Sequence, residues 1–425
     1  MNKKIVLILL ISLINDFCYS QKSYSELFTG KMLRLNYTIT NYKDSVEAKF
    51  VDFSVANKWG GENYVVNNCK KYGIFYMEMI DSCSNNVLYT YSYNSLFSEW
   101  LDIDLSKNKS KTYKECVKMP FPKKTCLINV YKLNSKHEYK LILSEYFNPK
   151  YDKFKCKTST TYPYKHIKSS KSKNSINIAI LAEGYQKNEK KKFLQSAKEY
   201  SERIFETEPY KKYQKLFNVY AVFDESKDNG CDIPNKNIYK NTIMDFSYNT
   251  FNMERYVMSE NYWAISNVAQ SVPYNHIIVL VNSDIYGGGG IYNYYSVFSA
   301  NNYHSKEVMV HELGHSFAGL DDEYEDNATY NTDIDNKYEI LSPNLTNLVE
   351  FSSKWEKYID KSTPIPTPKN SKHKIGVFEG GRYCYKGIYR PCLHCLMHDL
   401  ETNYYCEICE KIVEETILNQ TQNNE

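Results

Sequence analysis

The pattern of hydrophobic and polar positions divides the chain into two parts. In the first part, short runs of alternating or β-branched residues recur between clusters of Asn, Ser, Asp and Lys, which is the pattern of strands joined by turns. Many short strands separated by turn clusters predict an all-β sandwich for residues 21–156. The predicted strands cover residues 32–40, 46–55, 73–80, 87–93, 126–132 and 139–145.

The second part alternates strand-like and helix-like segments. Residues 157–175 are rich in Lys, Ser, Thr and Tyr and poor in aliphatic residues, and they are predicted to be a linker. From Ile176 onward, alternating apolar and amphipathic runs are typical of an α/β layer, so residues 176–425 are predicted to form the second domain. The predicted strands are 176–182, 217–223 and 276–281, and the predicted helices are 187–206 and 251–270.

The first twenty residues have the pattern of a secretion signal. Lys3 and Lys4 precede an apolar run over residues 5–14, which is too short to cross a bilayer as a stable helix. The small residue Ser20 ends a cleavage site, so residues 1–20 are predicted to be a signal peptide and the protein to be secreted or displayed at the cell surface. Lipid attachment at Cys18 is the alternative, but Asn, Asp and Phe precede it where small residues are usual. No second hydrophobic span follows, so no stable membrane span is expected.

Composition narrows the possible functions. The hydrophobic content of 42% is enough for packed cores. The net charge of +3 comes with no basic block or arginine stripe, so no nucleic-acid partner is expected. The 41 tyrosines are attributed to coding bias rather than to an aromatic binding surface. Nothing in the pattern indicates an oligomeric state.

The cysteines agree with export. Twelve are present, and loss of Cys18 with the signal would leave eleven, an odd number that predicts one thiol without an internal partner. Exported chains form disulfides, and these are the favoured prediction. Two Cys-x-x-Cys pairs, Cys392 with Cys395 and Cys406 with Cys409, are also typical of a structural zinc site, although the ten residues between them are a short interval. The connectivity, or a second zinc, stays open.

The strongest candidate chemistry lies at residues 311–315, where the sequence reads His-Glu-Leu-Gly-His. Flanking apolar residues and the following Gly319 predict a helix that ends at this glycine. Positions i and i+4 share one helix face, so His311 and His315 are predicted to bind one Zn²⁺. Glu312 is predicted to take a proton from a zinc-activated water, and the expected reaction is hydrolysis of a peptide bond.

The third metal ligand is expected in the acidic cluster that follows. In extended forms of this motif the helix breaks at a glycine, and the third ligand comes three residues later. Counting from Gly319 gives Asp322, whereas counting from the second histidine gives Asp321. Asp322 is preferred because the glycine makes the turn, and Asp321 and Glu323 remain alternatives.

Four glycines at 287–290 precede a short apolar run at 295–300. No Gly-Lys-Ser or Gly-Lys-Thr sequence follows them, so a phosphate loop is not favoured. The glycines are predicted to be a flexible loop, and residues 295–300 an edge strand that leads into the helix with the two histidines. An edge strand of this kind pairs with the substrate backbone in zinc peptidases.

Together these motifs resemble the IgA-peptidase family of secreted zinc metallopeptidases, over residues 26–415. The family signature ends in Gly-Leu-x-Asp-Glu-Tyr, which places its ligand acid on Asp322, although many relatives have a small residue where Asp321 stands. The resemblance implies an α/β metzincin-like peptidase domain behind an N-terminal β domain, and immunoglobulin A as one possible substrate. Further similar segments are residues 59–61, 96–100, 181–185, 286–290, 389–391 and 395–397.

The resemblance also bears on the residues near the chain end. Met397 is expected to form a methionine turn beneath the zinc. His394 and His398, which flank it, are expected at the surface or behind the ligands.

Other polar residues are expected to have no part in catalysis. His276 and His304 are expected to be structural. An acidic stretch at 224–232 does not follow a calcium-binding pattern and is predicted to be a solvated loop.

A second class of function is a secreted binding protein, such as an adhesin or glycan-binding module, whose peptidase domain has lost activity. The β-rich first domain motivates this alternative, because sandwiches often carry surface recognition. The intact His-Glu-His set argues against it.

Overall fold

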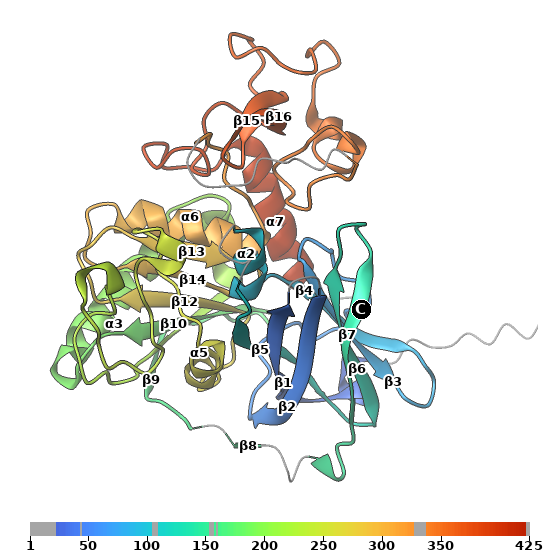
Figure 1. Cartoon of the computed structure of the whole chain (residues 1–425), viewed down its shortest axis with the longest axis vertical. Helices are drawn as coiled ribbons and strands as arrows, with labels where there is room; N and C mark the ends of the chain where they lie inside the picture. Colours follow the sequence, from blue (N-terminus) through green and yellow to red (C-terminus); the bar gives the residue numbers. More distant parts are fainter. Residues whose placement is uncertain are drawn as a thin grey trace, which may run out of the picture.

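The structure of the protein is a computed structural model (Figure 1). The structure describes residues 23–42, 45–103, 109–152, 157–158, 160–326 and 337–421. The predicted signal peptide, with Cys18, lies outside the described residues. No helix among the described residues is long and apolar enough to cross a bilayer.

Two four-stranded sheets dominate the N-terminal part. The first has the order β5-β1-β2-β8 and the second the order β4-β3-β6-β7. All pairs are antiparallel except β2 with β8. The elements of this part are α1 (Tyr24–Leu27), β1 (Phe28–Tyr42), β2 (Ser45–Ala56), β3 (Phe75–Asp81), β4 (Val87–Tyr93), α2 (Leu96–Asp102), β5 (Thr112–Pro122), β6 (Cys126–Leu133), β7 (Tyr139–Phe147) and β8 (Lys157–Thr158).

A six-stranded mixed sheet organises the second part. Its order is β13-β14-β12-β10-β11-β9, with four parallel strands in the middle and an antiparallel strand at each edge. The strands are β9 (Tyr164–Lys168), β10 (Ile176–Glu183), β11 (Phe217–Val222), β12 (His276–Val281), β13 (Gly288–Ile291) and β14 (Tyr295–Ser299). The helices that accompany the sheet are α3 (Lys190–Ile204), α4 (Tyr210–Tyr213), α5 (Tyr262–Ala269) and α6 (Ser305–Ala318).

The remaining elements lie toward the end of the chain. The hairpin of β15 (Phe378–Gly381) and β16 (Cys384–Arg390) forms a small lobe, drawn at the top of Figure 1. Helix α7 (Glu407–Thr421) runs from this lobe back toward the body of the molecule.

Alternate residues of β10 point into two different cores, because successive side chains of a strand face opposite sides of the sheet. Ile178 and Ile180 pack with buried residues of α3, α6 and α7. Ala179 and Leu181 pack into a core that includes α5 and both N-terminal sheets. The N-terminal sheets and α5 therefore share one continuous hydrophobic core with one face of the six-stranded sheet, and α6 lies on the other face.

The predicted strands of both parts are found within a few residues of their expected ends. Strand β5 and helix α2 were not predicted. The helix predicted over residues 251–270 is restricted to Tyr262–Ala269, because isolated backbone bridges hold residues 256 and 258 in extended conformation instead. Within the predicted linker, residues 164–168 form β9 and pair with β11, so this stretch belongs to the sheet.

The glycine run also differs from the prediction. Residues 288–290 are not a flexible loop but part of β13, which is the edge strand of the sheet. Strand β14 lies between β13 and β12 and is therefore internal, although it was predicted to be the edge. The reason is steric: without side chains, β13 can approach α6 closely, and a Cβ atom on Gly290 would lie 2.3 Å from the carbonyl oxygen of Glu312.

Candidate metal centre

Helix α6 ends at a turn that reverses the chain. Gly319 has a φ of +69°, the left-handed conformation that glycine adopts without strain. Its N–H donates to the carbonyl of His315 at 3.0 Å, and the N–H of Leu320 donates to the carbonyl of Gly314 at 3.3 Å. These bonds satisfy carbonyls at the helix end and direct the following residues back along the helix.

The turn brings three side chains of the predicted site together. The Nε2 atoms of His311 and His315 are 3.1 Å apart. One carboxylate oxygen of Asp322, Oδ1, is 3.0 Å from Nε2 of His311 and 3.3 Å from Nε2 of His315. His311 and Asp322 are buried, and the three donor atoms converge on one point.

Main-chain carbonyls orient both imidazole rings. The Nδ1 atom of His311 is 3.0 Å from the carbonyl oxygen of Leu396, and Nδ1 of His315 is 2.6 Å from the carbonyl oxygen of Leu320. A carbonyl only accepts, so each Nδ1 carries the proton, and the neutral ring then presents a lone pair at Nε2. With both rings neutral, two lone pairs and a carboxylate oxygen in contact repel one another unless a positive charge, a proton or a metal ion, lies between them. This donor set therefore fits a metal ion, and the carbonyls act as the outer partners that metal-bound histidines usually have.

The electrostatics of the ring–carboxylate pair agree with a site built for positive charge. Burial alone would lower the pKa of His315, but the Asp322 carboxylate beside it raises this pKa to about 10. Burial would raise the pKa of Asp322, and the two imidazoles instead hold it well below its usual value.

The two alternative acids point elsewhere. Asp321 accepts a hydrogen bond from Ser342 Oγ at 3.0 Å and from the backbone N–H of Asp322 at 2.9 Å. Glu323 accepts from the side-chain amide of Asn344 at 3.0 Å and lies 3.1 Å from Sγ of Cys409. Of the three acids considered from sequence, the geometry brings Asp322 to the histidines.

Glu312 lies between the two histidines in sequence and beside them in space. One ligand atom each from His311, Glu312 and His315 lie within 4.8 Å of one another. Burial raises the pKa of the Glu312 carboxyl, and the two histidines oppose this shift. Its carboxylate faces β13, because a Cβ atom built on Gly288 would be 3.1 Å from Oε1 of Glu312.

Met397, the residue of the predicted methionine turn, packs against α6. It is fully buried, and its sulfur would be 2.9 Å from a Cβ atom built on Gly314. The residue before it supplies the carbonyl that orients His311. His394 is exposed, whereas His398 is half-buried and its Nε2 is 3.6 Å from a carboxylate oxygen of Glu325. Neither residue is close to the three converging donors by any described contact.

The other residues weighed from sequence lie away from the centre. His276 is buried on β12 and its Nε2 is 3.0 Å from the side-chain oxygen of Gln420, and His304 precedes α6 at the surface. The acidic stretch at 224–232 is less solvated than predicted. Asp224 is fully buried at the end of β11, and Asp232 accepts the N–H of Lys240 at 2.6 Å.

Tyr383 and Arg255 are residues near the centre that sequence reasoning missed. The hydroxyl of Tyr383 donates to Oδ2 of Asp322 at 2.5 Å, so both oxygens of this carboxylate have a partner. Arg255 approaches the hydroxyl of Tyr324 at 3.4 Å, and its charge favours the ionised form of Glu312. No motif surrounds either residue, so only their position in space identifies them.

The centre opens into a cleft of about 1450 Å³. Both parts of the chain line it: Glu99 and Asp102 of α2 and Lys132 of β6 face the glycines of β13 and the metal centre. Burial raises the pKa of Glu99 to about 8, and its carboxylate accepts a hydrogen bond from the hydroxyl of Tyr256. The N-terminal part therefore forms one wall of the cleft above the candidate centre.

Comparison with known proteins identifies two matching family models. The model described as IgA Peptidase M64 matches residues 165–374 and 369–417, and the model described as Peptidase M64 N-terminus matches residues 23–144. No curated protein matches the chain.

Proposed function

The chain belongs to the IgA peptidase M64 family and is a peptidase with protein or peptide substrates, and we propose that it is a zinc-dependent endopeptidase. The observation that carries this proposal is the convergence of His311 Nε2, His315 Nε2 and Asp322 Oδ1 on one point. Two imidazole nitrogens and one carboxylate oxygen are a usual donor set for catalytic zinc, and they leave a fourth position open. We further propose the metzincin-like arrangement for this domain, with Met397 as its methionine turn.

The residues around the centre have distinct proposed roles. When bound, zinc supplies Lewis acidity that polarises the scissile carbonyl and acidifies a water. Glu312 accepts the proton of that water and afterwards donates it to the leaving nitrogen. Tyr383 holds Asp322 through its second oxygen, so that the first oxygen stays directed at the histidines.

We propose that the substrate lies along β13. This strand is the edge of the six-stranded sheet, and its glycines line the cleft beside Glu312. The backbone of Gly288 is already bonded to Arg255 and Val257, so the substrate would pair with the residues of β13 that follow it. An extended peptide can add to a sheet edge through main-chain hydrogen bonds, and this mode requires no particular side chain at each position. The absence of side chains on Gly288 and Gly290 lets this strand lie close against α6, which places its backbone beside Glu312.

The test of the proposed mechanism is the isosteric change Glu312→Gln. It removes the group that accepts the proton but leaves the three donors in place, so zinc content should stay at the wild-type level. The rate of casein or immunoglobulin A cleavage should fall by about 10²–10⁴-fold. Glu307→Gln, a partly exposed glutamate one turn or so earlier on α6, is the matched control and should retain activity. Unchanged cleavage by Glu312→Gln would refute the mechanism.

Immunoglobulin A is a candidate substrate because the family description names it, and specificity itself lies in the cleft. A cleavage-site profile on a peptide library would identify the preferred residues. We also propose that residues 1–20 direct export, which N-terminal sequencing of the mature protein tests. The non-catalytic binding module is not favoured, because the His-Glu-His set is intact and its donors converge.

A further inference from the structure

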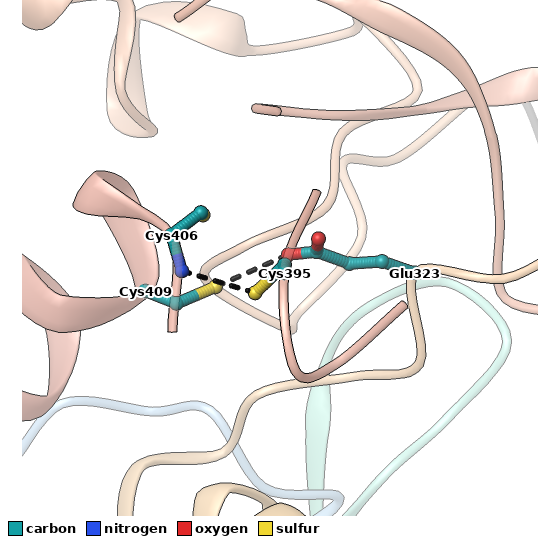
Figure 2. A group of neighbouring side chains, drawn as sticks. All are labelled: Glu323, Cys395, Cys406 and Cys409. Carbon is teal, nitrogen blue, oxygen red and sulfur yellow. Dashed lines mark hydrogen bonds between the residues drawn. The ribbon is translucent and has the colours of Figure 1, made fainter. Parts of the chain in front are cut away.

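A second group of side chains that can act as metal ligands lies near the candidate metal centre. Glu323, Cys395, Cys406 and Cys409 are all buried, and one ligand atom from each lies within 4.8 Å of the others (Figure 2). They come from three separate segments: the turn after α6, the loop after β16, and the start of α7. The tertiary fold therefore assembles this group. Only Cys406 and Cys409, which form a Cys-x-x-Cys pair, are neighbours along the sequence.

The donor atoms lie close enough together to share one metal ion. In a tetrahedral zinc site with Zn–S bonds of about 2.3 Å, neighbouring sulfurs are separated by about 3.8 Å. The contacts in the group connect different members rather than one pair: Cys409 Sγ is 3.1 Å from Oε1 of Glu323, and the N–H of Cys406 donates to Sγ of Cys395 at 3.2 Å. A backbone N–H directed at a sulfur is a feature of metal-bound thiolates, which are better acceptors than thiols.

Glu323 supplies an independent argument for a cation. Its side chain is fully buried, and its Oε2 has no hydrogen-bond partner among the described residues. Arg390, whose charge favours the ionised form of Glu323, is itself bonded to Glu325 at 3.1 Å. Burying a carboxylate without a compensating charge is costly, and a metal ion at the centre of the group would provide that charge.

We propose that Glu323, Cys395, Cys406 and Cys409 bind a second metal ion, with zinc as the ion that suits three thiolates and one carboxylate. Each thiol gives up its proton when the ion binds. Cys406 and Cys409 lie at the N-terminal end of α7, where the helix dipole favours the thiolate form. Cys392 contacts Cys406 but lies outside the four-donor group.

The proposed ion would stabilise the segments that hold the residues of the first metal centre. Glu323 follows Asp322 directly, and its N–H donates to the carbonyl of Met397 at 2.8 Å. Cys395 lies two residues before Met397 and precedes the residue whose carbonyl orients His311. A metal ion at this position would cross-link α7, the methionine turn and the segment that carries Asp322.

A disulfide is the competing use of these cysteines. A disulfide among these three cysteines, or between Cys406 and the neighbouring Cys392, would leave the Glu323 carboxylate buried with no partner of opposite charge. All ten cysteines that the structure describes are free thiols, so the disulfides expected for an exported chain stay a prediction. Metal binding accounts for all four donors at once.

Cobalt(II) distinguishes the two uses because cobalt bound to thiolates absorbs in the near ultraviolet, and cobalt bound by histidine and carboxylate does not. The full-length protein, freed of metal under reducing conditions, is titrated with Co²⁺ alone. The near-ultraviolet band should form in the wild type and in His315→Ala, and it should be lost in Cys409→Ser. Cys384→Ser, a buried thiol in the same part of the chain but outside the group, is the control and should keep the band.

Metal content and thiol mapping decide the case even if Cys409→Ser does not fold. Wild-type protein as purified should contain one equivalent of zinc more than His315→Ala, which retains the thiolate site. Peptide mapping of the wild type without reductant should recover Cys395, Cys406 and Cys409 as unlinked thiols. A disulfide that includes any of these three, or a wild type without the cobalt–thiolate band, would overturn the proposal. If Cys392→Ser loses the band and Glu323→Gln keeps it, Cys392 and not Glu323 is the fourth ligand, and the proposed ligand set is wrong.

Discussion

At the scale of single residues, the proposed metal centre depends on the direction of one aspartate side chain. Asp321 and Asp322 are adjacent and chemically identical, but their side chains leave the backbone in different directions. One carboxylate meets Ser342, and the other meets His311 and His315. The glycine turn at the end of α6 sets this direction, because the left-handed residue determines where the chain re-approaches the helix.

The pair of aspartates allows a matched experiment. Asp322→Ala removes one of three converging donors, and zinc affinity should fall by more than the roughly 10–100-fold typical for loss of an outer partner. Asp321→Ala removes a donor that faces away, so its zinc affinity should stay close to the wild-type value. Zinc affinity is measured by competition with a chelator. If Asp321→Ala loses the metal and Asp322→Ala keeps it, the ligand assignment is wrong.

At the scale of secondary-structure elements, the contact between β13 and α6 places the edge of the sheet beside the helix that carries His311 and His315. Gly288 and Gly290 face the helix, and added Cβ atoms would meet the side chain of Val308 and the backbone of Glu312. The glycine run is therefore a packing requirement of the peptidase part, and the same closeness brings the sheet edge to Glu312.

The change Gly290→Ala tests this packing. The new methyl group would lie 2.3 Å from a backbone oxygen of α6, so the strand or the helix must move. Overpacking of this kind destabilises a fold by on the order of 1–3 kcal/mol. We expect a lower thermal midpoint together with reduced peptidase activity, measured by calorimetry and by cleavage of casein. Ser296→Ala, at the position paired with Gly290 on β14, is the control and should change both values less. A fully active and equally stable Gly290→Ala variant would contradict the packing argument.

The contact between β12 and α7 predicts a dependence of stability on pH. Burial lowers the pKa of His276 to about 3, and its hydrogen bond with Gln420 opposes this shift only in part. The unfolded chain takes up a proton near pH 6.5, whereas the folded chain does not, so stability contributed by neutral His276 is lost as pH falls from about 6.5 toward 3. The slope from this residue is at most about 1.4 kcal/mol per pH unit.

The variant His276→Gln removes this titration and keeps a polar partner for Gln420. Its free energy of unfolding, measured by urea denaturation at several pH values, should fall less steeply than that of the wild type below pH 6.5. His394→Gln changes an exposed histidine and should leave the wild-type slope unchanged. Equal slopes for His276→Gln and the wild type would show that His276 does not stay neutral in the folded protein.

At the scale of the whole molecule, the two family-matched parts depend on one another. Strand β5 and helix α5 are joined by buried bonds: Trp263 Nε1 donates to the carbonyl of Glu115 at 2.7 Å, and Cys116 Sγ lies 3.2 Å from Ser266 Oγ. Arg34 of β1 donates to the side-chain oxygen of Asn267 at 2.6 Å. Since one hydrophobic core includes both parts, the N-terminal sheets serve as the packing partner of the peptidase sheet as well as a wall of its cleft.

This shared core predicts that the peptidase part is not stable alone. A fragment of residues 160–425 would expose the apolar face of α5 and the side chains of β10 that face it. We expect this fragment to aggregate or to bind a hydrophobic dye, and to cleave casein far more slowly than the full chain. Size-exclusion chromatography and dye fluorescence measure the first effect. A monodisperse fragment with the thermal midpoint and activity of the full chain would contradict the interdependence.

The sequence alone was sufficient to predict features that arise from neighbouring positions along the chain. Strand and helix periods repeat over two or about four residues, so β10, α3 and most N-terminal strands were predicted from local patterns. The histidine pair and the glycine turn are likewise local, because a helix places i and i+4 on one face, and this was enough to choose Asp322. The resemblance to the IgA-peptidase family was also visible in short motifs, and both family models match.

Only the tertiary structure decided the features that depend on distant residues coming together. The glycine run was predicted to be a loop because its sequence has no strand pattern, and it becomes an edge strand because α6 leaves no space for side chains. Tyr383 and Glu99 reach the cleft from remote segments, and neither has a recognisable motif. The two Cys-x-x-Cys pairs suggested that four cysteines form one set, whereas the fold groups Glu323 with only three of them. The reason is that packing, and not spacing along the chain, determines which distant segments come into contact.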